Sequence, residues 1–176
     1  MGSNFGFHSV VGGVPIPPVQ LKYGSFYDTT DQSATLINTG YAMQFNNTDA
    51  TSTNGFVIEN DLLGNPTRIK ALSSGVFNLM FSAQIFRSSG GAKQTIDVWL
   101  RTNDLNVPNT NTRVNVQANA DYLVLAWNFF LQLNAGQYAQ IMWATTSTDI
   151  SIQFDPASSL HPETPSVIAT INQVSN

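Results

Sequence analysis

The chain has 176 residues, no cysteine, a formal net charge of −4 and 10% charged residues, against roughly 25% in an average soluble protein. This length suits one domain with its own hydrophobic core. The composition excludes disulfides, thiolate metal ligands and a cysteine nucleophile. With few basic residues and no basic run, it also argues against nucleic-acid binding.

The first 21 residues differ from the rest of the chain. They hold Pro15, Pro17, Pro18 and several glycines without any alternation, which favours an extended or polyproline-like conformation. They lack the basic and apolar regions of a secretory signal, so none is expected. One interpretation is a disordered tail. The other is an arm that docks on a neighbouring subunit, because the segment is more apolar than a free tail requires. The candidate docking residues are Phe5, Phe7, Val10, Val11, Val14 and Ile16.

From residue 22 onward, strand patterns follow one another with short polar turns between them. No segment shows a helical period, and even the most apolar stretch alternates strictly. The pattern predicts an all-β fold, a two-sheet antiparallel jelly-roll sandwich of about ten strands over residues 22–176, with residues 1–21 as an extended arm. The expected strands cover residues 23–27, 41–45, 56–59, 67–72, 76–87, 94–102, 112–117, 122–133, 137–145, 150–154 and 167–174.

The longest alternating segment, residues 75–87, carries large apolar residues on both faces. Phe77, Leu79 and Phe81 share the face that should enter the core, whereas Met80 and Phe86 fall on the other. A monomer rarely exposes so much apolar area. We therefore expect one aromatic-rich sheet to pack against another subunit; the alternative is that some of these residues lie beneath loops. The candidate interface residues are Met80, Phe86, Trp99, Tyr122, Val124, Phe130, Tyr138 and Met142.

No motif indicates an enzyme. The chain contains no Gly-x-Ser-x-Gly elbow, P-loop or Gly-x-Gly-x-x-Gly. His8 and His161 lack partners at metal-ligand spacing, and Asp28 with Asp31 forms only part of a calcium loop. We expect no catalytic residue, no metal site and no cofactor.

Sugar binding is a weaker possibility that the sequence leaves open. Asn- and Thr-rich loops could hydrogen-bond a glycan, and aromatic rings could stack on it. However, Trp99, Trp127 and Trp143 all fall within expected strands, where packing in the core or in an interface is the favoured interpretation.

Three segments resemble the globular heads of complement-type proteins and the tumour necrosis factor jelly rolls. These segments are GVFNLMFSAQIF, NAGQYAQIMW and SVIATINQV, and the match extends over roughly residues 23 to 175. The resemblance implies the same jelly roll, with the last strand near a trimer axis. No Gly-X-Y stalk is present, so the ligand and calcium sites of the animal proteins are not carried over.

The segments IDVWLRTNDLNVPNTNTRV, AWNFF and TPSVI resemble small jelly-roll structural proteins of bacteriophages. This resemblance implies a homotrimer, assembled in the bacterial cytoplasm, that decorates the capsid or forms a short head fibre. Its arm would dock on other virion proteins, either the major capsid protein or an appendage base. The alternative is a tail-fibre tip or a receptor-binding head that contacts a glycan on the host surface. No nucleic-acid or membrane partner is expected.

Overall fold

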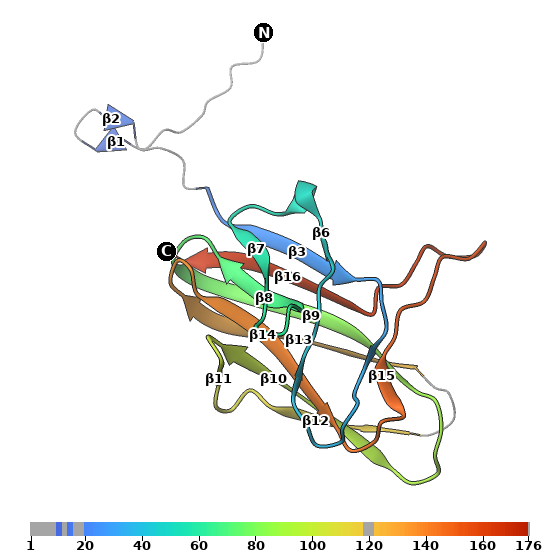
Figure 1. Cartoon of the computed structure of the whole chain (residues 1–176). Helices are drawn as coiled ribbons and strands as arrows, with labels where there is room; N and C mark the ends of the chain where they lie inside the picture. Colours follow the sequence, from blue (N-terminus) through green and yellow to red (C-terminus); the bar gives the residue numbers. More distant parts are fainter. Residues whose placement is uncertain (1–9, 12–13, 16–19, 118–121, 176) are drawn as a thin grey trace.

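The structure, a computed structural model, describes residues 10–11, 14–15, 20–117 and 122–175. Within these residues two seven-stranded antiparallel sheets pack face to face as a sandwich, and a single 3-10 turn, η1 (Ala50–Ser52), interrupts the β-structure (Figure 1). The expected all-β, two-sheet jelly roll is therefore confirmed.

The first sheet, here called the β9 sheet, has the strand order β4–β15–β9–β16–β3–β6, and β13 pairs with the free side of β9. The 13-residue β9 is its centre, bonded along its length to β13 on one side and to β16 and β15 on the other. Its strands are β3 (Tyr23–Asp28), β4 (Gln32–Ser33), β6 (Asn47–Thr48), β9 (Gly75–Arg87), β13 (Tyr122–Leu133), β15 (Ile150–Ile152) and β16 (Val167–Ser175).

The second sheet, here called the β14 sheet, has the strand order β11–β10–β14–β8–β7. In addition, β12 pairs with β10 and β5 pairs with β14. Its strands are β5 (Tyr41–Ala42), β7 (Phe56–Asn60), β8 (Pro66–Ala71), β10 (Gln94–Thr102), β11 (Leu105–Asn106), β12 (Thr112–Val116) and β14 (Tyr138–Thr145).

The core lies between the two sheets and is built from one face of each long strand. Phe77 and Leu79 of β9 are fully buried, as are Ile96 and Val98 of β10. Aromatic rings link the layers: Phe77 meets Phe56 of β7 edge to face at 5.0 Å between ring centroids. The alternation in the sequence therefore identified the core face correctly.

All eleven expected strands are present, with boundaries shifted by up to three residues. Of the segment expected at 41–45, only β5 remains a strand, although Met43 and Phe45 still donate backbone hydrogen bonds to Ile141 and Pro66. The sequence pattern missed β4, β6 and β11, since a two-residue strand is too short to show alternation.

The N-terminal segment contains two further short strands, β1 (Val10–Val11) and β2 (Val14–Pro15), which pair antiparallel with each other. They hold three of the candidate docking residues, Val10, Val11 and Val14. The other three, Phe5, Phe7 and Ile16, lie outside the described residues.

Candidate assembly face and polar pocket

The outward surface of the β9 sheet carries a group of exposed apolar side chains. Cross-strand pairing sets Tyr122 beside Phe86, with ring centroids 5.0 Å apart, and Phe130 beside Asn78. Phe130 is 67% exposed and Met80 43% exposed. Further members of this surface on β3 and β16, not identified from the sequence, are Tyr23, Ile168 and Val174.

The described strands of the β9 sheet contribute no charged side chain to this surface, and the charges beside it, Asp49 and Glu163, lie outside the strands in a hollow shared with Ile168. The charged residues on the described strands of the β9 sheet are Asp28 and Arg87, and both are buried. Each falls on the core-facing side of its strand, because buried and exposed positions alternate along β3 and β9. We call the outward-facing residues of β3, β9, β13 and β16 the assembly face.

The outward surface of the β14 sheet is different in character, since charged residues alternate there with polar ones. Arg113 of β12 forms an ion pair with Asp97 of β10 at 3.0 Å, and Lys70 of β8 pairs with Glu59 of β7 at 3.1 Å. The strand charges exposed to solvent are thus concentrated on one sheet.

The eight candidate interface residues do not share one sheet. Met80, Phe86, Tyr122, Val124 and Phe130 belong to the β9 sheet, whereas Trp99, Tyr138 and Met142 belong to the β14 sheet. The expectation of a single aromatic-rich sheet containing all eight is therefore wrong. Alternation along a strand shows which side chains leave the core, but it does not show to which sheet the strand belongs.

Two residues of the second group lie beneath a loop, as the alternative interpretation allowed. Met142 is buried and pairs with Ala42 of β5. A Cβ placed on Gly40, just before β5, would lie 3.2 Å from the Trp99 ring, so the chain at that glycine approaches the ring closely. The indole Nε1 of Trp99 donates a hydrogen bond to Asn106 at 2.8 Å.

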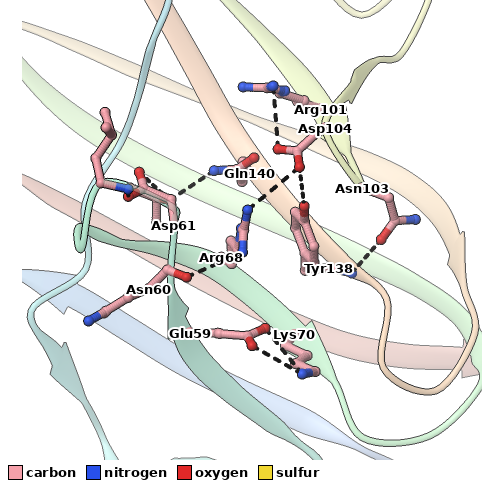
Figure 2. A network of polar contacts seen from close by, with 12 residues as sticks. Glu59, Asn60, Asp61, Arg68, Lys70, Arg101, Asn103, Asp104, Tyr138 and Gln140 are labelled. Atoms are coloured by element: carbon pink, nitrogen blue, oxygen red, sulfur yellow. Dashed lines mark hydrogen bonds and ion pairs between the residues drawn. The ribbon is translucent and has the colours of Figure 1, made fainter.

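The third residue of that group, Tyr138, belongs to a network of polar contacts on the β14 sheet (Figure 2). Its hydroxyl donates to Oδ2 of Asp104 at 2.7 Å. The same carboxylate forms ion pairs with Arg101 at 3.3 Å and Arg68 at 3.5 Å. The Arg68 guanidinium also lies over the Tyr138 ring, 4.5 Å from its centroid.

Backbone geometry explains why an aspartate occupies this position. Asn103 and Asp104 are the two loop residues between β10 and β11, and both have positive φ, 47° and 64°. A two-residue hairpin turn of this kind requires the left-handed backbone conformation at both positions, and Asn and Asp adopt that conformation more readily than most residues. Asn103 also contacts the start of β14, since its Oδ1 accepts a hydrogen bond from the backbone N–H of Tyr138 at 3.1 Å.

A pocket of about 400 Å³ opens next to this network. Its floor includes Gln140, which is buried, and its rim includes the turn from Asp61 to Asn65. The lining side chains that carry charge are Arg68, Arg101, Asp31, Asp61 and Asp104.

Two residues that line the pocket each have a side-chain atom that is shielded from solvent and has no hydrogen-bond partner, Oε1 of Gln140 and Nε of Arg68. The Gln140 side chain is oriented by its neighbours. The Thr67 hydroxyl donates to Asp61 at 3.3 Å and so accepts from Gln140 Nε2 at 2.8 Å. The amide oxygen of Gln140 therefore remains as an unused acceptor.

The surroundings of the polar network change the pKa of one of its members, Tyr138. Burial, followed by the hydrogen bond to Asp104 and the charge of that carboxylate, raises the pKa of the Tyr138 phenol. The raised pKa extends to higher pH the range over which the hydroxyl stays protonated and donates to Asp104.

Asp28, which the sequence offered as part of a calcium loop, has a structural role. Asp28 accepts hydrogen bonds from Thr30 and Asn46 and so fixes the loop after β3.

Within the described residues no group of three His, Asp or Glu side chains could hold a metal ion. No helix in the described part of the chain is long and apolar enough to span a membrane. Trp143, one of the rings considered for stacking on a sugar, is buried in the core.

Sequence reasoning did not identify the pocket. Arg68, Asp104 and Gln140 come from three separated segments, and each by itself resembles an ordinary outward-facing strand or turn residue. The one sequence feature that pointed to this region was the Asn103-Asp104 pair, which is typical of a tight hairpin turn. The Asp104 carboxylate in such a turn lies at the sheet surface.

Comparison with known proteins supports the fold. No protein-family model matches the chain, and neither does any curated protein. Among solved structures, the crystal structure of murine APRIL at pH 5.0 aligns with a TM-score of 0.54 and 8% sequence identity, covering 88% of this chain and 100% of that one. The crystal structure of murine APRIL at pH 8.5 aligns with a TM-score of 0.50 and 10% identity over the same shares. The chain thus has a tumour-necrosis-factor-like jelly-roll fold.

Proposed function

We propose that this protein is a structural subunit of a bacteriophage virion that forms a homotrimer through the assembly face. The observation that carries the proposal is the lack of charge on the outward faces of the described strands of the β9 sheet, where exposed apolar side chains such as Phe130 lie among uncharged polar ones such as Asn78. A sheet surface that stays in water normally carries charged or polar residues, and large exposed apolar patches mark interaction sites. The occupant is a second copy of this chain, because interfaces between permanently associated copies are apolar and poor in charge.

The rest of the proposal extends the sequence resemblance. Trimers of this kind would decorate the capsid or form a short head fibre, with the N-terminal arm docked on another virion protein. The low overall charge suits a protein whose surface is partly buried in an assembly. A receptor-binding head at a fibre tip is the alternative assignment, and adsorption of the isolated domain to host cells would favour it.

The trimer is tested by mass measurement on the purified full chain. We expect a trimer at micromolar concentration, and a monomer after Phe130→Asp, which places a charge in the assembly face. Leu105→Asp is the matched control, because Leu105 is 73% exposed, comparable to the 67% of Phe130, but lies on β11 of the other sheet. A monomeric wild-type protein, or dissociation by both substitutions alike, would contradict the proposed assembly.

Docking in the virion is tested separately, by deleting residues 1–18. We expect the truncated protein to fold and to form trimers, but to be absent from purified particles. Particles that still carry the truncated protein would show that the arm does not dock. The copy number per particle then separates capsid decoration, with hundreds of copies, from a vertex or tail appendage.

A further inference from the structure

We propose that a hollow formed by Trp99 and the loop between β11 and β12 binds the ring of a neutral saccharide. The hollow lies on the outward surface of the β14 sheet, away from the assembly face, so this inference does not rest on the proposed trimer. Its volume of about 500 Å³ falls within the range of known small-molecule sites.

Trp99 supplies an aromatic surface to this hollow. The side chain points outward from β10, because its neighbours Val98 and Leu100 are buried in the core. One edge of the ring is fixed, since Nε1 donates to Asn106 at 2.8 Å and the chain at Gly40 lies close to Cζ2 and Cη2. The residue is nevertheless partly exposed and lines the hollow. Indoles combine a large apolar surface with a polar tip, so the C–H face of a sugar ring is a suitable partner.

Asparagine amides lie around the tryptophan, and the partners of two of them determine how they are oriented. An indole N–H only donates, so Asn106 presents Oδ1 to Trp99 and keeps Nδ2 as a donor. A carboxylate accepts, so Asn111 donates from Nδ2 to Asp97 at 2.9 Å and keeps Oδ1 as an acceptor. Both asparagines are exposed to solvent, so a ligand in the hollow can reach them. The described residues of the lining include four asparagines, namely Asn38, Asn106, Asn109 and Asn111.

A saccharide matches this combination of groups. Each hydroxyl both donates and accepts, so neighbouring hydroxyls of one ring can accept from Asn106 Nδ2 and donate to Asn111 Oδ1. The amides of Asn38 and Asn109 are also exposed, and each offers a donor and an acceptor to further hydroxyls. Amides beside an aromatic ring thus match the two kinds of surface on a sugar, its hydroxyls and its C–H face.

The charge of the lining favours a neutral ligand over an anionic one. Asp97 and Arg113 are the charged residues in the described part of the lining, which leaves a formal charge of zero. They are paired with each other, since Arg113 Nε donates to both carboxylate oxygens of Asp97, at 3.0 and 3.1 Å. A phosphate or carboxylate group would therefore have to compete with Asp97 for its only cation.

Hydrogen bonds hold the loop that carries these amides. The backbone N–H of Val107 donates to the carbonyl of Leu100 at 3.0 Å, and the N–H of Leu100 donates to Thr110 Oγ1 at 3.1 Å. The Thr110 hydroxyl donates in turn to the carbonyl of Val107 at 2.7 Å. Asn109, inside this closed turn, has a φ of 61°, which asparagine tolerates better than most residues. Such preorganisation lowers the entropy that binding would otherwise cost.

Saturation-transfer NMR on the full chain tests the class of ligand. The probes are D-glucose, D-galactose, D-mannose, N-acetyl-D-glucosamine and L-rhamnose, each compared with its open-chain alditol. An alditol keeps the hydroxyls of its sugar but lacks the rigid ring that would stack on Trp99. We expect signal transfer to at least one of the five sugars and weaker binding of the matching alditol. Silence from all five sugars, or an alditol that binds as tightly as its sugar, would overturn the proposal.

Two variants locate the binding in the hollow. Trp99→Leu removes the aromatic surface and should raise the dissociation constant about tenfold. Asn109→Gly removes one amide but keeps a residue that adopts a φ of 61° without strain. It should raise the dissociation constant severalfold, the scale of one lost hydrogen bond.

Asn115→Ala is the matched control, because Asn115 is exposed on the neighbouring strand β12 but lies outside the lining. It should leave the dissociation constant unchanged. Should Trp99→Leu fail to fold by circular dichroism, the pair at Asn109 and Asn115 decides. Binding that neither variant of the hollow weakens, or that the control weakens equally, would also overturn the proposal.

Discussion

Tyr138 shows how one side chain can serve packing and polarity together. Its ring supports the Arg68 guanidinium at 4.5 Å, and its hydroxyl donates to Asp104. The face of the ring attracts the cation, while the hydroxyl stabilises the carboxylate that also holds Arg101. The residue therefore organises the polar network beside the pocket.

The raised pKa of Tyr138 predicts a loss of stability in alkali. The folded protein holds the phenolic proton more tightly than the unfolded chain, whose tyrosines titrate near 10.0. The contribution of Tyr138 to stability is thus fully present below that value and is lost as the pH rises through it towards the folded pKa.

Urea unfolding on either side of that pH checks this prediction, with Tyr138→Phe as the comparison. The phenylalanine variant should be less stable at neutral pH, since the hydrogen bond to Asp104 is gone, and should lose less stability in alkali than the wild type. An equal alkaline loss in both proteins would mean that Tyr138 is not the responsible group.

At the scale of elements, β9 combines two functions on its two faces. Phe77 is fully buried against the other sheet, while Met80 is 43% exposed on the assembly face. Phe77→Ala should lower the free energy of unfolding by about 3–5 kcal/mol, because it leaves a cavity in the core. This loss should be the same at every protein concentration.

Met80→Ser should act differently. It removes apolar area from the surface, so the domain should still fold, but the stability that the subunits gain from association should fall. Unfolding curves over a range of protein concentrations distinguish the two variants. Unfolding midpoints of Met80→Ser that equal those of the wild type at every protein concentration would place Met80 outside the interface.

The strands also show how much of the structure could be predicted from the sequence. The long strands β9, β10 and β13 were predictable because each repeats its alternation many times. Their partner strands were not predictable, since hydrogen bonding between strands leaves no local pattern, and so Trp99 and Tyr138 were grouped with residues that belong to the other sheet. The pocket was out of reach for the same reason: Gln140 and Thr67 meet only through tertiary packing.

For the whole molecule, the division of charge between the two sheets decides how an association through either one would respond to salt. The β14 sheet presents charged residues such as Asp97, Arg101 and Arg113, whereas the assembly face presents none. An association through the β14 sheet would thus depend on salt, and one through the assembly face would depend chiefly on buried apolar area.

The proposed trimer should therefore be insensitive to ionic strength. Between about 0.1 M and about 1 M NaCl the Debye length falls from about 10 Å to about 3 Å, which screens contacts between exposed charges but leaves apolar burial in place. Sedimentation equilibrium over this range should give a dissociation constant that stays within about threefold. A trimer that separates as salt rises would mean that the charged β14 sheet forms the interface, and the Asp97–Arg113 pair would then be the first contact to remove.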